Sequence, residues 1–183
     1  MRKLFIACLT GLTIAVFFIS SAFAQSPYQK GDKIGQVGIG YGFAGIYGTS
    51  SVPPISLGFQ FGIEDKISVG GLIGYTSSTY DWGWFGNNYS WTYTYILIGA
   101  RGEYHFLQNS SNMDGYAGAT LGYAIASVSQ PSGYSGTGYT AGASYAVFGA
   151  HLGLRYYFNP NIAIFGEVGY GVGYITAGVA FKL

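Results

Sequence analysis

Between Ile55 and Ile63, every second residue is large and apolar, and the residues between them are small or polar. Successive side chains of a β-strand point to opposite faces, so this alternation gives a strand one apolar face and one polar face. The pattern recurs along the chain. Beyond residue 24, helical periodicity is missing and no stretch is long and apolar enough for a transmembrane helix. The sequence therefore predicts an all-β protein.

Eight segments carry this alternation, and they cover residues 37–43, 55–63, 67–75, 96–106, 117–125, 148–158, 162–170 and about 174–183. Short polar connections at 64–66, 107–112 and 159–161 alternate with longer ones at 44–54, 76–91 and 129–142, and the last connection, near 171–173, is tight. Transmembrane barrels have an even number of strands, with short periplasmic turns and long extracellular loops. We therefore expect an eight-stranded antiparallel up-and-down transmembrane β-barrel with both termini in the periplasm.

The charges within the strands support this architecture. Four charged residues lie well inside predicted strands and share the parity opposite the apolar face: Arg101, Glu103, Arg155 and Glu167. A lipid-facing Arg near the bilayer midplane costs about 2 to 4 kcal/mol. The apolar face should therefore contact lipid, and the charges should form an ion-pair network in the lumen. Arg155 should lie opposite Phe165 and diagonal to Glu167, within reach of a long side chain. Because eight strands leave little internal space, we expect a largely plugged lumen.

Outward aromatic residues cluster at the two ends of the predicted strands. Tyr41, Phe43, Tyr75, Tyr123 and Tyr170 lie near the loop ends, and Tyr104, Phe106, Tyr156, Phe158 and Phe181 lie near the turn ends. Amphipathic rings favour the two membrane interfaces, so this distribution predicts two girdles.

The N-terminus has the order of a secretory signal peptide. Arg2 and Lys3 precede an apolar stretch, and residues 22–24 supply a small-x-small cleavage motif. We expect cleavage after Ala24, which leaves a single β-barrel domain at residues 25–183. The mature chain would contain no cysteine, because Cys8 lies in the leader.

Charge is scarce in this sequence. Charged residues make up 8% of the chain, against about 25% in ordinary soluble domains. Loss of Arg2 and Lys3 leaves six of the eight basic residues against seven acidic ones. The sequence therefore has no basic surface typical of nucleic-acid binding.

The C-terminal strand points to a family. Residues Thr176, Gly178, Phe181 and Leu183 match the order polar, x, Gly, x, x, aromatic, x, hydrophobic. With the eight predicted strands, this ending resembles the small eight-stranded outer-membrane β-barrel family, which includes the OmpA transmembrane domain and OmpX-like proteins. The resemblance implies that Gly178, Phe181 and Leu183 form the β-signal read by the barrel-assembly machinery. It also implies a location in the bacterial outer membrane, contact with outer-membrane lipid and, by default, a monomer.

All three tryptophans lie in the second long connection: Trp82, Trp84 and Trp91. Tyr80, Phe85, Tyr89, Asn87 and Asn88 accompany them, a composition suited to stacking on a surface glycan or holding a protein ligand. The alternative is that these rings extend the hairpin above the membrane and rest on lipid headgroups. We expect a structural or surface-interaction, adhesin-like role, with a narrow porin-like channel for small solutes as the alternative.

Chemistry is weakly indicated. His105 and His151 lie on different strands, and His151 lacks the His-x-Ser spacing of lipid A deacylases. The glycine runs at 38–42 and 169–173 do not open a helix, as a nucleotide site requires. We therefore predict no catalytic residues, cofactor or metal. A lipid A-modifying enzyme is a further alternative, and so is a soluble ligand-carrying barrel, against which the outward aliphatic face argues.

Overall fold

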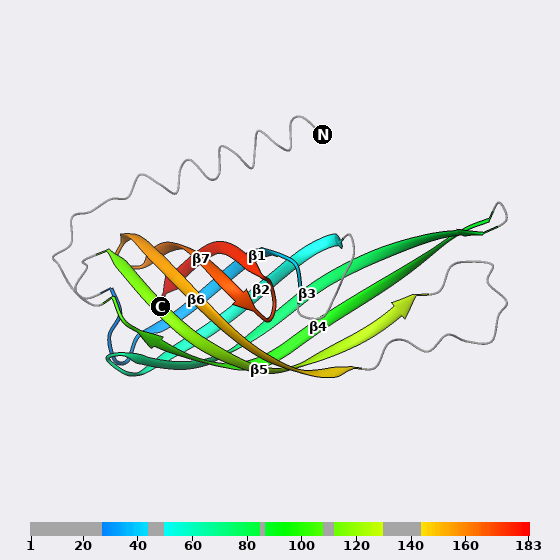
Figure 1. The fold of residues 1–183 in the computed structure, drawn as a ribbon. Helices are drawn as coiled ribbons and strands as arrows, with labels where there is room; N and C mark the ends of the chain where they lie inside the picture. Colours follow the sequence, from blue (N-terminus) through cyan, green and yellow to red (C-terminus); the bar gives the residue numbers. More distant parts are fainter. Residues whose placement is uncertain (1–26, 44–49, 85–86, 108–111, 130–143) are drawn as a thin grey trace, which may run out of the picture.

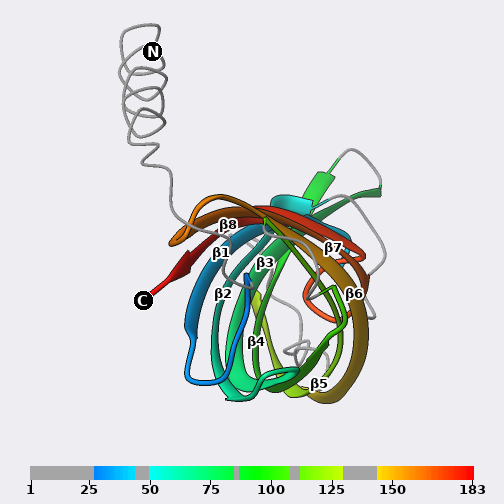
Figure 2. The same cartoon turned by 90° about the vertical axis from the view of Figure 1, so that its left-hand side faces the viewer.

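The computed structural model describes residues 27–43, 50–84, 87–107, 112–129 and 144–183. Each strand pairs antiparallel with the next one along the chain, and the last strand pairs with the first, so the sheet closes into a barrel (Figures 1 and 2). This confirms the predicted eight-stranded antiparallel barrel. The strands are β1 (Lys33–Tyr41), β2 (Ser50–Glu64), β3 (Ile67–Trp84), β4 (Asn87–His105), β5 (Met113–Ser129), β6 (Tyr145–Asn159), β7 (Ile162–Tyr170) and β8 (Ile175–Lys182). Among the described residues, no helix is both long and apolar enough to span a membrane.

The C-terminal strand closes the barrel. The register between β1 and β8 runs from Ile34 opposite Lys182 to Tyr41 opposite Ile175. At the turn end, the Lys182 ammonium lies 2.7 Å from Oδ2 of Asp32, which comes just before β1. A terminal strand that would be an open edge on its own therefore has its backbone groups paired.

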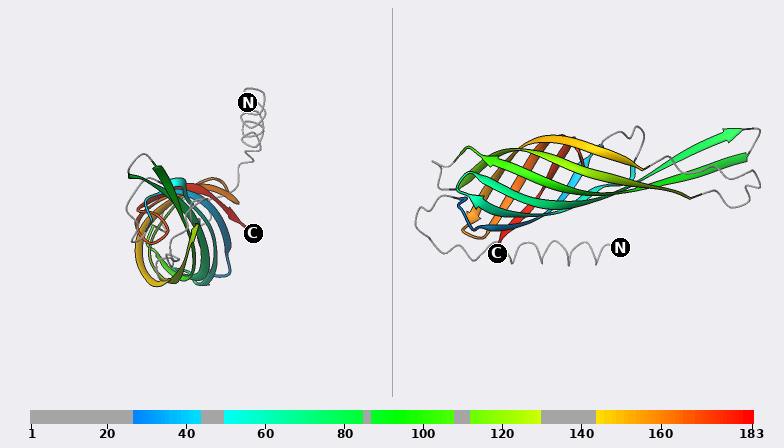
Figure 3. Two further views of the ribbon diagram at one scale, coloured as in Figure 1. Left: turned by 90° about the vertical axis from the view of Figure 1, so that its right-hand side faces the viewer. Right: turned by 90° about the horizontal axis from the view of Figure 1, so that it is seen from below.

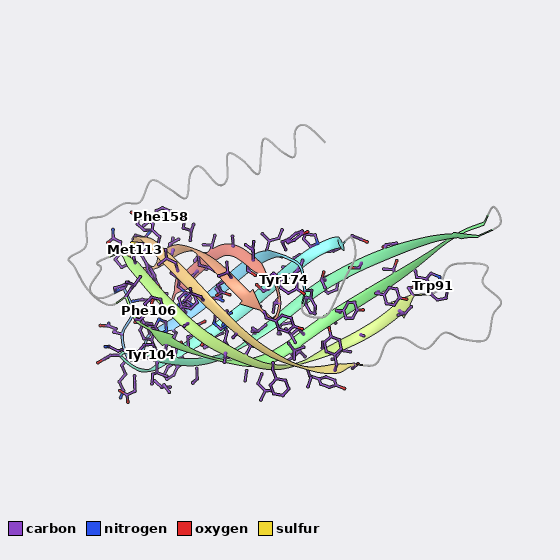
Figure 4. The ribbon with its side chains drawn as sticks, viewed as in Figure 1. Trp91, Tyr104, Phe106, Met113, Phe158 and Tyr174 are labelled. Atoms are coloured by element: carbon purple, nitrogen blue, oxygen red, sulfur yellow. The ribbon has the colours of Figure 1, made fainter. Side chains whose placement is uncertain are left out.

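The two faces of the sheet divide as the alternation predicts. In β6, for example, Phe148, Leu152 and Leu154 are exposed outward, whereas Val147 and Arg155 are buried inward. Figure 4 shows Tyr104, Phe106 and Phe158 near the turn end of the barrel. The exposed aliphatic band therefore has aromatic side chains at its turn-end margin, as in transmembrane barrels.

One aromatic assignment was wrong. Phe43 was expected in the outer girdle, but its side chain is 2% exposed and packs with Leu72, Leu97 and Val147 inside the barrel. The preceding residue, Gly42, has φ of 73°, a left-handed conformation that breaks the strand alternation after β1. The backbone therefore turns Phe43 into the loop-side mouth of the lumen.

The predicted long connection at residues 76–91 is mostly strand. β3 continues to Trp84 and β4 begins at Asn87, with unbroken pairing from Ile67 opposite Tyr104 to Trp84 opposite Asn87. Pairing of β2 with β3 ends at Ser78, and pairing of β4 with β5 ends at Thr92. Five pairs of β3 and β4 therefore extend beyond the described parts of β2 and β5 as a projecting hairpin (Figures 1 and 3).

The other two long connections had different outcomes. In the connection predicted at 44–54, residues 50–54 belong to β2, with register shifts on either side of Val52. Pro53 and Pro54 lack an N–H group, which is consistent with an irregular ladder at this strand end. The connection predicted at 129–142 falls almost wholly outside the described residues.

Candidate functional site

The centre of the lumen holds an ion-pair network built around Glu103. Its Oε1 lies 2.9 Å from Nε of Arg101, and its Oε2 lies 2.9 Å from Nη2 of Arg155. Gln60 adds a hydrogen bond from Nε2 to Glu103 Oε1, at 3.1 Å. The Glu103 and Arg155 side chains have no exposed surface. This carboxylate therefore bridges two guanidinium groups from strands β4 and β6.

Glu167 forms the loop-side part of the network. Its Oε1 accepts hydrogen bonds from Arg101 Nη2 and from the Tyr116 hydroxyl, each at 2.7 Å. Arg101 Nε also donates to Nε2 of His151 at 3.0 Å, and a guanidinium can only donate, so this histidine nitrogen is an acceptor. The structure brings Arg101, Glu103, Arg155 and Glu167 into one network.

The pairing within this network differs from the prediction in one respect. Arg155 does lie opposite Phe165. However, its ion-pair partners are Glu103 and Asp114, and Glu167 pairs with Arg101 on β4. Diagonal neighbours along the sheet were the basis of the prediction. Asp114 lies directly opposite Arg155 on the neighbouring strand β5, whereas the Arg155–Glu103 and Arg101–Glu167 pairs join strands that are not neighbours and meet across the lumen of the closed barrel.

Asp114 belongs to the network, and sequence reasoning missed it. Its Oδ2 lies 3.0 Å from Arg155 Nη1, and its Oδ1 lies 2.7 Å from His105 Nδ1. The predicted strand began only at Ala117, whereas β5 begins at Met113. Extending the alternation back from Thr120 through Tyr116 would have placed Asp114 on the inward face.

His105 lies between a serine hydroxyl and an aspartate carboxylate, in the order of a catalytic triad. Ser68 Oγ lies 3.0 Å from His105 Nε2, and Asp114 Oδ1 lies 2.7 Å from Nδ1. Serine hydrolases use this order of nucleophile, base and orienting acid. Here all three side chains are buried, at 0% exposure for Ser68 and His105 and 1% for Asp114. A substrate therefore has no access to Ser68 in this conformation.

The segment before β1 covers this group. The Tyr28 ring stacks on the His105 ring with centroids 3.5 Å apart and an interplanar angle of 5°. The Tyr28 hydroxyl donates to the Ile67 carbonyl at 2.8 Å, and Gly31 N–H donates to Gly62 O at 2.8 Å. Residues 27–32, the N-terminal strap, are thus fixed across the turn end of the lumen.

Two apolar layers enclose the polar network. The turn-side layer consists of Tyr28, Ile34, Tyr157, Ala163, Phe165 and Ala180. The loop-side layer consists of Phe43, Leu72, Leu97, Ala124 and Val147, with Tyr95, Tyr145 and Val172 packed against it. Between the network and the loop-side layer lies a cavity of about 30 Å³, bordered by Arg101, His151 and Glu167. A water needs roughly 10 to 15 Å³ on this measure, so the cavity has room for about two.

Large side chains fill the space that the inward glycines leave. A Cβ at Gly153 would meet the ring of Tyr116, and one at Gly178 would come within 2.7 Å of the Phe165 ring. The glycines therefore accommodate rings in the lumen and do not widen it into a channel at these positions.

The remaining predicted site residues lie in the β3–β4 hairpin and in or directly after β8. Trp82 and Trp84 are in the projecting part of β3, where the structure describes only the backbone, and Trp91 on β4 is partly buried. Gly178 faces the lumen, whereas Phe181 and Leu183 face outward and are 41% and 75% exposed. Within the part of the chain that the structure describes, no cluster of three His, Cys, Asp or Glu side chains could hold a metal ion.

Comparisons with known proteins identify the fold. No protein-family model and no curated protein sequence matches the chain. The outer membrane protein OprG from Pseudomonas aeruginosa is similar in structure, with a TM-score of 0.57 and 12% identity over 85% of this chain and 97% of that one. The N-terminal β-barrel domain of OprF from the same organism has a TM-score of 0.50 and 15% identity over 87% and 100%.

The attachment invasion locus protein Ail of Yersinia pestis, solved with the heparin analogue sucrose octasulfate, has a TM-score of 0.50 and 12% identity over 85% of this chain and 98% of that one. These identities are too low to transfer a function. The structural similarities to these proteins, together with the closed antiparallel topology, show that this chain has the fold of the small eight-stranded outer-membrane β-barrels.

Proposed function

We propose that the chain is an integral protein of the bacterial outer membrane whose role is surface interaction, carried by the β3–β4 hairpin. One contrast carries this proposal. The lumen is filled by a polar network between two apolar layers, whereas the hairpin projects five residue pairs beyond the described parts of its neighbouring strands. The exposed aliphatic face supports contact with outer-membrane lipid. We further propose export by the signal peptide at residues 1–24 and insertion by the barrel-assembly machinery through β8.

A catalytic role is less well supported. The only candidate nucleophile that we identify in the described part of the lumen, Ser68, is fully buried beside His105. The Tyr28 ring covers that histidine from the periplasmic side. We therefore propose that the Ser68, His105 and Asp114 group stabilises the plugged lumen and does not catalyse a reaction.

A channel role is also less well supported, because the apolar layers on both sides of the network oppose the passage of hydrated solutes. Single-channel recording in planar bilayers tests this point. We expect no discrete conductance from the purified protein, and regular openings would favour the narrow channel.

The surface role is tested with a shortened hairpin. Replacement of residues 80–91 by Asn-Gly joins Thr79 to Thr92 with a two-residue turn, and these two residues are already opposite each other. Cells that display either form are compared for adherence to epithelial monolayers and to one another. We expect the shortened form to reach the outer membrane with normal heat-modifiable mobility and to lose adherence. Equal adherence of the two forms would contradict the proposal.

A further inference from the structure

The outer, aliphatic surface of the barrel has a groove across β6, β7 and β8. Its floor is formed by Gly166 and Ala177, which lie opposite each other in the register of β7 and β8. Larger apolar side chains form its walls: Leu152, Leu154, Val168 and Ile175. The groove has a volume of about 450 Å³. Small-molecule sites usually measure about 300 to 1,000 Å³, so the groove has the size of a ligand site.

Small residues in one row across four strands produce this groove. Gly115 on β5 lies opposite Leu154 on β6. Leu154 in turn lies opposite Gly166, and Gly166 lies opposite Ala177. The ring of Phe106 lies over Gly115, since a Cβ there would come within 2.8 Å of it. Phe106 also lines the groove, so its ring marks one end of the row.

Gly166 leaves space that a side chain would otherwise fill. Glycine inside a strand weakens it, and it often marks a bulge, a tight bend or the close approach of a ligand or another backbone. The register on both sides of Gly166 has no shift, so there is no bulge at this position. A Cβ at Gly166 would meet no heavy atom within 4 Å, so packing of the folded barrel does not require glycine here. The close approach of a molecule outside the barrel accounts for it.

The chemistry of the groove restricts its ligand to an apolar one. The two polar residues that border it, Glu167 and Thr176, face inward: Glu167 pairs with Arg101 in the lumen, and Thr176 is 7% exposed. The backbone groups of β7 are paired with β6 on one side and with β8 on the other. A polar ligand or an added strand would therefore lose hydrogen bonds with water and gain none in the groove.

The size of the groove argues against a protein partner. Three strand spacings of about 4.8 Å and three residues of about 3.3 Å give a mouth on the order of 14 Å by 10 Å. A stable protein interface takes roughly 800 Å² from each partner, which is several times this area. A second copy of the chain would therefore bind mostly outside the groove, whereas a single narrow chain matches it.

The position of the groove indicates one side of the membrane. Phe106 lies at the turn end of the barrel (Figure 4), and Gly166 is the middle residue of β7. The groove therefore runs from the turn-end aromatic margin towards the middle of the barrel. One leaflet of the hydrocarbon core is about 15 Å thick, half of the roughly 30 Å of the whole core, and this is similar to the length of the groove.

We propose that the groove binds one fatty acyl chain of a phospholipid in the leaflet at the turn end of the barrel. Within a membrane, such binding depends on van der Waals packing, and small residues favour it because they let the partner approach closely. The walls contact the chain from the sides while Gly166 and Ala177 contact it from below. This inference rests on the proposed membrane location and goes beyond the proposed surface role.

Photocrosslinking tests the inference. The full mature barrel is refolded into vesicles of phosphatidylethanolamine and phosphatidylglycerol with a trace of phosphatidylcholine that carries a diazirine in one fatty chain. Peptide mass spectrometry then maps the adducts. The exposed β3 residues Val69 and Ile73 are the reference for ordinary lipid contact. We expect roughly fivefold more adducts, or a larger excess, on the wall residues Leu152 and Val168.

A filled groove provides the decisive variant. Gly166→Leu should keep normal heat-modifiable mobility, because a Cβ meets no atom there, and it should abolish the excess of adducts on Leu152 and Val168. Gly102→Leu is the matched control. Gly102 is an exposed glycine on β4 that does not line the groove, and a Cβ there would lie 4.0 Å from the nearest atom. This control should leave the excess unchanged. If Gly166→Leu does not fold, Ala177→Leu fills the same groove from β8.

Native mass spectrometry of the detergent-purified protein identifies the occupant. We expect one retained phospholipid in the wild type and in Gly102→Leu, and none in Gly166→Leu. The inference is wrong if adducts are equally frequent on all exposed residues, or if the excess survives both groove-filling variants. Retained lipid A, or crosslinks between two barrels through the groove, would also overturn it.

Failure of the membrane location has a different signature. A barrel that does not enter the vesicles and gives no adducts on any exposed residue would contradict the proposed location, and the inference with it. A barrel that inserts and gives adducts on Val69 and Ile73 as often as on Leu152 and Val168 would overturn the acyl-chain site alone. Adherence of the shortened hairpin tests the surface role separately in either case.

Discussion

Arg155 and Glu103 lie on strands that are not neighbours, and their side chains meet inside the barrel with Nη2 2.9 Å from Oε2. Neither side chain has any exposed surface. Removal of one partner from such a pair leaves an uncompensated buried charge, and this is far costlier than the loss of a surface ion pair.

The first prediction concerns this network. Glu103→Gln keeps the side-chain shape but leaves Arg155 with Asp114 as its one carboxylate partner. We expect a loss of about 3 to 5 kcal/mol in the free energy of unfolding. Glu167→Gln should cost less, because Glu167 forms an ion pair with one arginine and its side chain is 10% exposed. Urea unfolding in lipid vesicles, followed by tryptophan emission and heat-modifiable gel mobility, measures both.

A surface ion pair provides the control. Lys30 and Glu64 lie 3.1 Å apart with about three-fifths of each side chain exposed. Exposed pairs contribute about 0 to 1 kcal/mol, so the free energy of unfolding of Lys30→Gln should lie within 1 kcal/mol of that of the wild type. A Glu103→Gln variant as stable as this control would contradict the proposed role of the network.

The inward position of the network residues could be predicted from sequence, because the side chains of a β-strand alternate between its two faces. The alternation alone placed Arg101, Glu103, Arg155 and Glu167 on the inward face, and the same rule would have found Asp114 had the strand been extended back to Met113. Parity, however, says which face a residue occupies and not which residue it meets. Partners across a closed lumen depend on barrel closure, and this is why Arg101 and not Arg155 pairs with Glu167.

The loop end was less predictable. Turn-forming and aromatic residues between 76 and 91 were interpreted as a loop, although the two-residue period continues through them to Trp84. Phe43 was misplaced because one glycine with positive φ ends the alternation, and a sequence does not show which glycine adopts that conformation.

The second prediction concerns the N-terminal strap. Tyr28→Phe keeps the ring that stacks on His105 but removes the hydrogen bond to the Ile67 carbonyl, which should cost about 0.5 to 1.5 kcal/mol at pH 8. Burial raises the pKa of the Tyr28 hydroxyl above its ordinary value near 10. The folded state therefore binds this proton more tightly than the unfolded state. Its stabilisation is complete below pH 10 and declines as the pH rises further.

Unfolding free energies at pH 8 and pH 11 test this sign. The difference between wild type and Tyr28→Phe should narrow at pH 11, because the wild type alone loses the contribution of this hydroxyl. Other tyrosines titrate in both proteins and cancel in the comparison. A difference that widens at pH 11 would show that the hydroxyl does not have the stated role.

The third prediction concerns the Ser68, His105 and Asp114 group. Because Ser68 is fully buried, the folded protein should not react with a fluorophosphonate probe. Ser68→Ala removes the hydrogen-bond partner of His105 Nε2 and should cost about 1 to 3 kcal/mol of stability. Probe labelling that is present in the wild type and absent from Ser68→Ala would instead reveal a catalytic serine.

The fourth prediction concerns Gly178 in the C-terminal strand. A Cβ at this position would clash with the Val37 carbonyl and come within 2.7 Å of the Phe165 ring. We therefore expect Gly178→Ala to prevent closure of the barrel even when purified protein refolds in detergent without assembly machinery. Leu183→Phe, directly after the same strand, is the matched control. Leu183 is 75% exposed, so this change should leave refolding intact. Heat-modifiable gel mobility after refolding measures both, and a Gly178→Ala protein that closes normally in detergent would mean that the glycine serves recognition alone.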